Sequence, residues 1–426
     1  NAHPHQAGSV AVVHNGIIEN FRSLRAELAD LGAHFLTETD TETVALLTQH
    51  HMTQGDDPVT AVRRTLARLE GAFALAFLFE GQPDLMIAAR KGSPLAIGYG
   101  EGEMYVGSDA IALAPLTHKI SYLEEGDCAV LTRSSVEITD HNGTLTNRLI
   151  KTIETDRTCI DKAGHKHFMS KEIAEQPLVI GAAISKYLSP EGVITLPGDE
   201  INFTSFDRVI MVACGTAFYA CLTAKYWFEQ IARLPVEIDV ASEFRYREPP
   251  IPPRTLAIFV SQSGETADTL AALRYCKGKA AQILSVVNVP ESSISRESNL
   301  ALPIHAGVEV GVASTKAFTC QLVVLYMMVL KAAHARDELN ADALFDHVSE
   351  LRNLPSVINH ALEESDKVHA AALKLSQAQD VIFLGRGQMY PLALEGALKL
   401  KEISYIHAEA YASGELKHGP IALIDE

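Results

Sequence analysis

The sequence lacks the features of a membrane protein or a nucleic-acid-binding protein. Its longest apolar run, residues 322–330, is far shorter than the roughly 20 residues that cross a bilayer. Lys and Arg number 36 against 53 Asp and Glu, and the net charge of −17 repels nucleic acids and anionic membranes. We therefore expect no nucleic acid and no membrane among the partners of this chain.

Cysteine is also scarce, and no two cysteines form a CxxC pair or lie near histidines at metal-binding spacing. This pattern suggests neither a zinc site nor a disulfide framework. It is typical of reduced thiols, so we expect a cytoplasmic protein with no metal and no other cofactor. The six cysteines are Cys128, Cys159, Cys214, Cys221, Cys276 and Cys320.

What is present is the composition of a globular protein, with 47% hydrophobic and 21% charged residues. A length of 426 residues predicts about three compact domains. The chain begins with Asn1 rather than Met, and no charged-then-apolar signal segment is found there. We expect a fragment of a longer protein.

Residues 10–150 alternate short apolar or β-branched runs with helical patterns. An apolar stripe that begins at Phe21 predicts a helix ending at Gly32, and Thr39-x-x-Glu42 predicts a capping box at the start of a second helix. These patterns predict a mixed, mostly antiparallel α/β layer domain. The predicted strands are 10–13, 73–79, 85–88 and 105–106, followed by a hairpin around Asn142-Gly143 that joins 136–138 to Leu145.

Residues 154–167 show no hydrophobic periodicity and carry many charges, which is typical of an interdomain linker. The pattern of secondary-structure signals changes after them. Beyond them, apolar strands at 209–213, 256–260 and 283–287 alternate with long helical stretches. This alternation predicts a parallel sheet with helices on both faces.

The sequence of residues 207–215 resembles that of residues 379–387, which lie 172 positions later. Each segment is predicted to contain a strand and a glycine turn that leads into a helix. A period this long indicates a domain duplication. The second copy reaches Glu426 after one strand, one helix and the start of another strand, which predicts truncation at the C-terminus. We expect domains at 1–153, 168–345 and 346–426, with the linker at 154–167.

A hydroxyl-rich turn, Ser261-Gln262-Ser263-Gly264-Glu265-Thr266, follows one predicted strand and precedes a helix. Backbone N–H groups and hydroxyls at a helix N-terminus can cradle a phosphate. The absence of a Lys after the glycine favours a phosphomonoester over a nucleotide. An ordinary N-cap at Ser263 is the alternative.

Two further turns have the same character. Cys214-Gly215-Thr216 follows the first strand of the parallel sheet, where open α/β sheets bind ligands, although its glycine could serve the turn alone. Residues 311–316 (GVASTK) precede an apolar helix. Three such turns from one sheet would converge on one pocket.

Side chains that could transfer protons lie in the second copy. Glu395, Lys399 and Glu402 share one helical face. A partly buried carboxylate there would have a raised pKa suited to proton transfer, whereas a solvated face would form only a salt-bridge ladder. His418 could move a proton near neutral pH or be an exposed bystander.

Near the N-terminus, Asn15 and Gly16 could donate hydrogen bonds to a developing oxyanion, and Asp40 could bind an ammonium group. The alternatives are a simple turn at Asn15-Gly16 and a role for Asp40 as a neighbour of a helix N-cap.

The motifs match one enzyme family along the whole chain and in the family's order. The matching stretches are 1–5 (NAHPH), 14–20 (HNGIIEN), 38–42 (ETDTE), 213–216 (ACGT), 261–266 (SQSGET), 311–319 and 394–420. Together they closely resemble the glutamine:fructose-6-phosphate aminotransferases, or glucosamine-6-phosphate synthases. The resemblance implies an α/β protein: a partial glutaminase domain of the N-terminal-nucleophile hydrolase fold (αββα), then flavodoxin-like parallel αβα sugar-isomerase (SIS) domains, the second incomplete.

The family releases ammonia from glutamine, isomerises fructose 6-phosphate to an aldose and installs the nitrogen, which begins hexosamine synthesis. The resemblance therefore implies glutamine and fructose 6-phosphate as substrates. It also implies that Asn15 and Gly16 form the oxyanion hole, that Asp40 binds the α-amino group of glutamine, and that His3 belongs to the surroundings of that site.

On the sugar side, the resemblance implies that Glu402 is the base that moves a proton between C1 and C2, supported by Lys399 and Glu395. His418 would open the sugar ring, reaching across from a partner subunit, which implies a homodimer. The implied sugar-phosphate-binding residues are Cys214, Gly215, Thr216, Ser261, Gln262, Ser263, Thr266, Val312 and Ser314.

The chain departs from the family pattern in four respects. No cysteine precedes Cys128, so the family's N-terminal nucleophile is missing, as are the arginine loop that closes over glutamine and the C-terminal lysine that forms a Schiff base. Ala217 stands where some members have a serine. We expect residues 1–426 alone to be inactive.

Two other functions use the same sugar-isomerase domains. A phosphosugar sensor would have no use for the N-terminal glutamine motifs. An amino-sugar deglycase would have no glutamine requirement, so measuring that requirement separates it from the aminotransferase.

Overall fold

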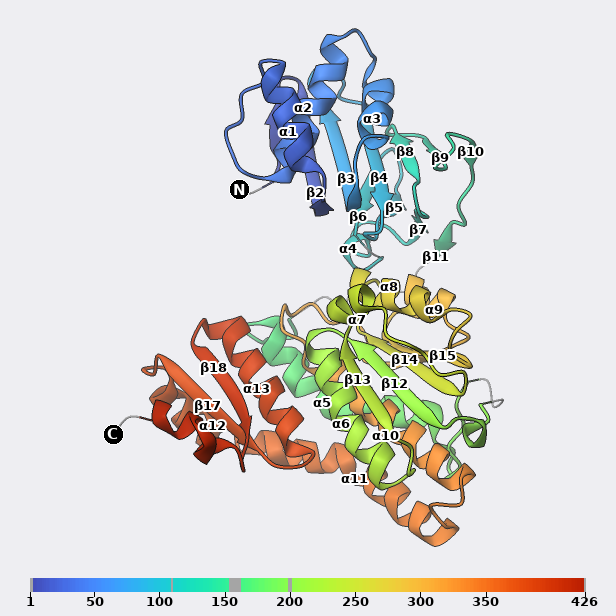
Figure 1. The fold of residues 1–426 in the computed structure, drawn as a ribbon, viewed down its shortest axis with the longest axis vertical. Helices are drawn as coiled ribbons and strands as arrows, with labels where there is room; N and C mark the ends of the chain where they lie inside the picture. The colour runs from blue at the N-terminus through green and yellow to red at the C-terminus, as the bar shows by residue number, and fades with distance from the viewer. Residues whose placement is uncertain (1–2, 109, 153–161, 198–200, 425–426) are drawn as a thin grey trace. The chain divides into compact units, whose positions relative to one another are not determined.

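The chain divides into two compact units, residues 1–161 and 162–426 (Figure 1). The structure, a computed structural model, describes residues 3–108, 110–152, 162–197 and 201–424. The boundary between the units falls inside the predicted linker, of which residues 154–161 and with them Cys159 lie outside the described residues. Two units are thus found where the length predicted about three domains.

Unit 1 contains two antiparallel sheets, in agreement with the predicted layer domain. The larger sheet has the order β1-β2-β3-β4-β8-β9-β10, and the smaller has the order β11-β7-β5-β6. Its strands are β1 (His5–Ala7), β2 (Val10–Ile18), β3 (Gly71–Phe79), β4 (Met86–Lys91), β5 (Ala96–Tyr99), β6 (Met104–Gly107), β7 (Lys119–Tyr122), β8 (Cys128–Leu131), β9 (Val136–Thr139), β10 (Leu145–Thr146) and β11 (Lys151–Thr152).

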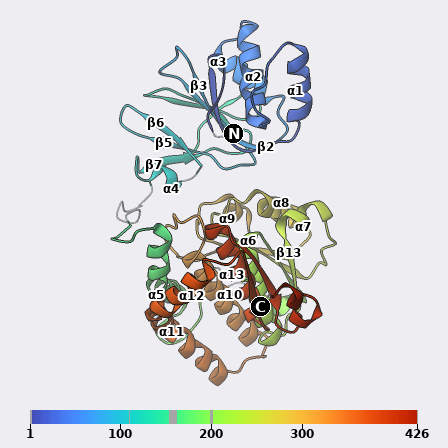
Figure 2. The ribbon, with the colours of Figure 1, turned by 90° about the vertical axis from the view of Figure 1, so that its left-hand side faces the viewer.

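Helices cover one face of the larger sheet (Figure 2). They are α1 (Phe21–Asp30), α2 (Asp40–Thr53) and α3 (Pro58–Leu66), and a short α4 (Ala110–Leu113) lies beside the smaller sheet. Both predicted helices are confirmed, and Gly32 ends the first with a φ of 88°. Helix α3 was missed, although Asp57 begins it by accepting hydrogen bonds from the N–H groups of Val59 and Thr60.

The capping box predicted at Thr39 and Glu42 is wrong. Thr39 occupies the N-cap of α2 but its side chain makes no capping hydrogen bond. The Glu42 carboxylate instead accepts hydrogen bonds from the N–H groups of Leu36 and Thr37, at 2.7 and 2.8 Å. Glu42 therefore fixes the loop that enters the helix, because that loop offers it two free donors.

Strand β2 is longer than its apolar residues predicted. Asn15 and Gly16, expected after the strand, lie within it, because β2 pairs with β3 over its whole length, from Val10 opposite Phe79 to Ile18 opposite Gly71. The predicted hairpin is confirmed with a longer loop than two residues, since β9 and β10 pair as predicted around it.

Unit 2 is built around a parallel five-stranded sheet in the order β13-β12-β14-β15-β16, which is the order of the flavodoxin-like fold that the resemblance implies (Figure 1). Its three central strands are fully or largely buried, as expected for a sheet covered on both faces, and its two edge strands are partly buried. They are β12 (Arg208–Ala213), β13 (Val236–Val240), β14 (Thr255–Ser261), β15 (Gln282–Val287) and β16 (Leu300–Pro303).

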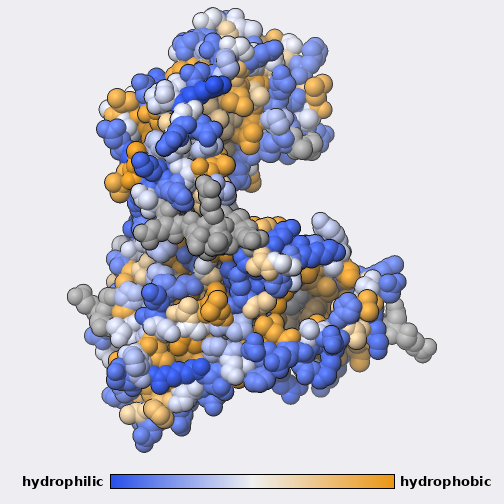
Figure 3. Space-filling model, turned by 180° about the vertical axis from the view of Figure 1, so that it is seen from behind, coloured by the Kyte–Doolittle hydropathy of each residue, from blue (hydrophilic) through white to orange (hydrophobic). Residues whose placement is uncertain are grey.

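Two hydrophobic cores lie on opposite faces of this sheet. The larger involves α5 (Phe168–Tyr187), α6 (Gly215–Gln230), α10 (Lys316–Ala335) and α11 (Ala341–Glu363), and the smaller involves α7 (Ala241–Arg247), α8 (Ala267–Cys276) and α9 (Ser293–Glu297). On the face of the molecule shown in Figure 3, hydrophobic residues are interspersed with hydrophilic ones.

Helix α10 corrects the expectation that nothing in the chain could cross a membrane. By length and composition it could span a bilayer, but 72% of its apolar window is buried inside the structure. The same helix supplies buried residues from Ala317 to Ala333 to the larger core of unit 2. Its apolar character therefore has an explanation in the packing of the fold.

The predicted repeat is visible as a second strand–turn–helix segment. After α11 and α12 (Ser365–Leu375), β17 (Asp380–Gly385) leads into α13 (Met389–Ser404) and the parallel strand β18 (His407–Ala412). Gly215 and Gly387, the matched glycines of the two copies, have φ values of 55° and 56°. The boundary expected between residues 345 and 346 falls inside α11, which runs through it without a break.

We expect Phe259→Ala to destabilise unit 2 by about 3–5 kcal/mol, because a fully buried ring in β14 would leave a cavity. Differential scanning calorimetry should show a lower melting temperature for the unit 2 transition. Val312→Ala, which truncates a fully exposed side chain in the same unit, should leave that temperature unchanged. Equal effects of the two substitutions would contradict the assignment of the core.

Candidate active site

The three predicted turns meet at one cavity of about 210 Å³ in unit 2. The first follows β12, the second follows β14, and the third precedes α10. The lining residues are Cys214, Thr216, Ala217, Val260, Ser261, Gln262, Ser263, Thr266, Ser314 and Gln321. Seven of the nine predicted sugar-phosphate residues are among them, so the expectation that the turns converge is confirmed.

The turn after β14 is held by its own hydroxyl groups. The Ser261 hydroxyl accepts a hydrogen bond from the Gly264 N–H at 3.0 Å and lies 2.9 Å from the Thr266 hydroxyl. The Ser263 hydroxyl accepts from the Glu265 N–H at 3.2 Å, and α8 begins only at Ala267. Ser263 therefore is not the N-cap, which leaves the N-terminal end of α8 next to the cavity.

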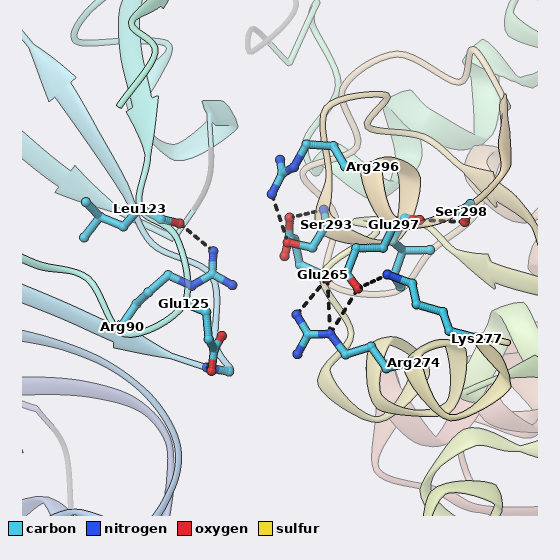
Figure 4. Close-up of polar contacts among 12 residues, drawn as sticks. Arg90, Leu123, Glu125, Glu265, Arg274, Lys277, Ser293, Arg296, Glu297 and Ser298 are labelled. Carbon is cyan, nitrogen blue, oxygen red and sulfur yellow. Dashed lines mark hydrogen bonds and ion pairs between the residues drawn. The ribbon is translucent and has the colours of Figure 1, made fainter. Parts of the chain in front are cut away.

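Position 264 requires a glycine, both because of its backbone conformation and because of the atoms around it. Its φ is 67°, and a Cβ placed on it would lie 1.9 Å from the Ser292 hydroxyl. The same turn is tied to α9, because Glu265 accepts a hydrogen bond from the Ser293 N–H at 2.8 Å (Figure 4).

Helix α9 is in turn joined to α8 by charge. The Glu297 carboxylate lies 2.7 Å from both the Arg274 guanidinium and the Lys277 ammonium (Figure 4). Burial acts to raise the pKa of Glu297, but the hydrogen bonds from these two cations outweigh it and lower that pKa. The ionised carboxylate thus bridges the two helices that flank the turn.

The third turn is held by two carboxylates. Glu309 accepts hydrogen bonds from the Ser314 hydroxyl at 2.8 Å and from the Thr315 N–H at 2.8 Å, at the start of α10. Glu172, buried in α5, accepts from the N–H groups of Val310 and Gly311 at 2.6 and 3.0 Å. Both ends of the turn that carries Ser314 are therefore fixed.

A charged cluster on α13 joins the cavity through Thr216. The Lys399 ammonium donates a hydrogen bond to the Thr216 hydroxyl at 3.0 Å, and that hydroxyl donates to the Glu395 carboxylate at 3.0 Å. Lys399 also pairs with Glu402 at 2.6 Å. Glu395, Lys399 and Glu402 therefore form the salt-bridge ladder that the sequence analysis gave as the alternative. This ladder is not simply solvated, because it is hydrogen-bonded to Thr216, a residue of the cavity.

Glu395 differs from the other members of the cluster in its burial. Its side chain is 7% exposed against 34% for Glu402, and its Oε2 atom has no hydrogen-bond partner among the described residues. Burial raises the pKa of Glu395 to about 7, against the opposing effect of Lys399. A proton can therefore reside on this carboxylate at neutral pH.

Some predicted residues lie away from the cavity. Val312, expected to line the sugar, is 100% exposed, because the turn points its side chain outward. Gly215 begins α6 and is not among the lining residues. His418 lies exposed in the short helix η3 (Leu416–His418).

Two lining residues, Val260 and Gln321, were missed by the sequence analysis, and a third, Ala217, was noted there only as a departure from the family. Val260 is one apolar residue of a buried strand, so it carries no signal of its own. Gln321, a polar residue in the most apolar helix of the sequence, carried a signal that was overlooked.

The predicted glutamine-binding residues are brought together in unit 1. Asp40, the first residue of α2, accepts a hydrogen bond from the Ile18 N–H at 2.8 Å, which places it beside the end of β2 that carries the exposed Asn15 and Gly16. His3 is exposed and its ring packs edge-to-face on His5, with 5.4 Å between ring centroids.

His14 lies beneath this edge. Its Nδ1 atom is 3.0 Å from the Thr41 hydroxyl and 3.7 Å from the Asp40 carboxylate. Burial lowers the pKa of His14 below its ordinary value, although Asp40 acts to raise it. A neutral imidazole thus supports Thr41 and Asp40.

No group of three or more His, Cys, Asp or Glu side chains among the described residues is arranged to hold a metal ion. The five described cysteines are free thiols. Burial raises the pKa of Cys214, so the thiol in the cavity wall carries no charge.

Comparison with known proteins finds a matching family model in each unit. A family model described as a glutamine amidotransferase domain matches residues 2–115, and one described as a SIS domain matches residues 202–331 and 374–426. The chain is similar to the glutamine–fructose-6-phosphate aminotransferase [isomerizing] of Zymomonas mobilis, with 55% identity over all of this chain and 70% of that protein. A relative of the same name in Bradyrhizobium diazoefficiens is 57% identical over the same shares.

Solved structures resemble unit 2. The C-terminal domain of a glucosamine-fructose-6-phosphate aminotransferase from Francisella tularensis matches with a TM-score of 0.61 and 45% identity, over 62% of this chain and 75% of that chain. A putative phosphosugar isomerase from Clostridium difficile matches with a TM-score of 0.54 and 19% identity, over 60% of this chain and 72% of that chain, and supports the fold alone.

We expect Gly264→Ala to weaken the binding of inorganic phosphate by about tenfold or more, because the added Cβ displaces Ser292 and strains the turn. Isothermal titration calorimetry measures the change. Gly278→Ala is the matched control, since Gly278 has a similar φ of 72° but open space around its Cβ position. Equal losses in both variants would show that the turn does not bind phosphate.

We expect the free energy of unfolding to fall as the pH rises from about 4.5 to about 7, because of Glu395. The substitution Glu395→Gln should remove this pH dependence. The raised pKa means that the folded state holds a proton which the unfolded state has released, so this contribution is complete below the unfolded pKa and lost above the folded one. Glu395→Gln should therefore gain roughly 2–3 kcal/mol relative to the parent over that range. Thermal unfolding at a series of pH values measures it, with the exposed Glu350→Gln as control.

Proposed function

The chain belongs to the family of glutamine–fructose-6-phosphate aminotransferases, and from this membership we propose how its residues share the reaction. The activity is the glutamine-dependent conversion of fructose 6-phosphate to glucosamine 6-phosphate. Unit 1 carries the glutamine amidotransferase part and unit 2 the sugar-isomerase part. Within unit 2 we assign residues 168–345 and 346–426 to two successive sugar-isomerase domains, which the two separate matches of the SIS family support.

In unit 1, we assign the recognition of glutamine to Asp40, which binds the α-amino group. The position of Asp40 at the first turn of α2 supports this role, because the hydrogen bond that its carboxylate accepts from the Ile18 N–H places it beside the exposed Asn15 and Gly16. Asn15 and Gly16 donate hydrogen bonds to the oxyanion that forms when the side-chain amide is attacked. His3 belongs to the surroundings of the same site.

In unit 2, the turn Ser261–Thr266 holds the phosphate group. Its hydroxyls and its N–H groups at the start of α8 are donors, and a phosphate dianion accepts hydrogen bonds through all of its free oxygens. Thr216 and Ser314 then contact the sugar, since they line the same cavity from the other two turns. This convergence is the observation that carries the assignment.

Glu402 is the base that removes a proton from C1 or C2 of the open-chain sugar and returns it to the other carbon. Its carboxylate is more exposed than that of Glu395 and is held by Lys399 at 2.6 Å, so it is accessible to the sugar and fixed in position. Lys399 and Glu395 position it, because both are fixed on the hydroxyl of Thr216.

The protein acts as a homodimer in the cytoplasm, with His418 of a second copy opening the sugar ring. The exposure of His418 supports this arrangement, since its own chain leaves the imidazole accessible to a neighbour. Free thiols in the described part of the chain are consistent with a reducing compartment.

The test is amination of fructose 6-phosphate by the protein expressed from its complete reading frame. Incubation with glutamine or with ammonium should yield glucosamine 6-phosphate by mass spectrometry, with glutamate formed only from glutamine. Glu402→Gln should lower the rate by about 100-fold to 10,000-fold, the usual contribution of a general base. Glu350→Gln, an exposed carboxylate on α11, should not. Binding of fructose 6-phosphate without any aminated product would favour a phosphosugar sensor or a deglycase.

A further inference from the structure

Gln321 is a buried polar residue in the wall of the sugar-phosphate cavity. It lies in the second turn of α10, its side chain is 1% exposed, and it lines the cavity together with Thr216 and Ser261. Its amide oxygen, Oε1, has no hydrogen-bond partner among the described residues. An unpaired buried carbonyl is unfavourable, because it has lost its water without gaining a donor.

The surroundings of Gln321 give no structural reason for an amide. Its neighbours on α10 are buried and apolar, including Cys320, Val323 and Val324, and a Leu or Met would suit the core better. Unlike a carboxylate, the amide cannot relieve its burial by taking up a proton at physiological pH. Because Gln321 lines the cavity, a bound ligand can supply the missing donor.

The chemistry of the unpaired atom identifies which part of the ligand it binds. A carbonyl oxygen only accepts hydrogen bonds, and the phosphomonoester dianion of a sugar phosphate has no proton to donate. A sugar hydroxyl does have one. We propose that Gln321 accepts a hydrogen bond from a hydroxyl of the bound sugar phosphate, and that it thereby selects the sugar rather than the phosphate. The inference deepens the proposed function and rests on it.

The first experiment compares two ligands of the same cavity. Gln321→Met keeps the size of the side chain but removes its acceptor, and should weaken the binding of fructose 6-phosphate about tenfold to a hundredfold, the effect of one buried hydroxyl left unpaired. Binding of methyl phosphate, a phosphomonoester that carries no hydroxyl group of a sugar, should change by less than about twofold when it is measured in the same way by isothermal titration calorimetry.

Ser285→Ala is the matched control for this experiment. Ser285 is a fully buried residue of β15 whose hydroxyl also has no partner in the part of the chain that the structure describes, but it does not line the cavity. Its substitution should change neither affinity. Equal losses for both ligands in Gln321→Met, or no loss for either, would overturn the inference.

A second measurement keeps the inference testable if Gln321→Met alters the packing of α10. A series of monodeoxy analogues of fructose 6-phosphate is titrated into the parent and the variant. One analogue should bind more weakly than fructose 6-phosphate to the parent, yet bind as well as fructose 6-phosphate to Gln321→Met. Identical losses in both proteins across the whole series would refute the contact. These experiments measure binding, so their outcome does not depend on whether the protein aminates the sugar. A parent protein that binds fructose 6-phosphate without aminating it would disprove the proposed function. The contact with Gln321 could still be tested in that protein by the same titrations.

Discussion

The sugar-phosphate site depends on one feature of the parallel sheet: the helices that follow two neighbouring strands pack on opposite faces of it. β12 and β14 pair along their length, but the helix after β12 packs in the larger core and the helix after β14 packs in the smaller one. The chain therefore separates at the carboxyl ends of these strands and leaves a crevice there. The cavity lies at this point, lined from both sides by Thr216 and Ser261. Its position follows from strand order before any polar side chain is considered.

This dependence explains why so much of unit 2 could be predicted from the sequence. A buried parallel strand is a nearly continuous apolar run, and the turn that follows it is short, so the residues of the turn are fixed relative to the sheet. The runs at 209–213 and 256–260 located two strands within one or two residues of their observed ends. The hydroxyl-rich turns then had to lie at the same edge. In unit 1 the short antiparallel strands carry weaker signals, and pairing with β3 extended β2 through Asn15 and Gly16, beyond its apolar residues.

The parts that could not be predicted depend on partners distant in the sequence. Glu42 has the spacing of a capping box, yet it bonds to Leu36 and Thr37, because the preceding loop folds back over the helix start. Val312 follows a glycine in a family-like turn, but whether it faces in or out depends on how Glu172, 138 residues before Val310, anchors that turn. The raised pKa of Glu395 likewise comes from packing against α6, which no pattern within α13 reveals.

The two copies of the duplicated segment contribute to the ligand site in different ways. The first copy meets the ligand cavity with its turn, through Cys214 and Thr216, whereas the second reaches Thr216 from the middle of its helix, through Glu395 and Lys399. The matched glycines of the two copies have nearly the same φ, but α6 begins at Gly215 whereas α13 begins at Met389, two residues beyond Gly387. One kind of strand–turn–helix unit thus contributes twice to the same ligand site, once through its turn and once through the side of its helix.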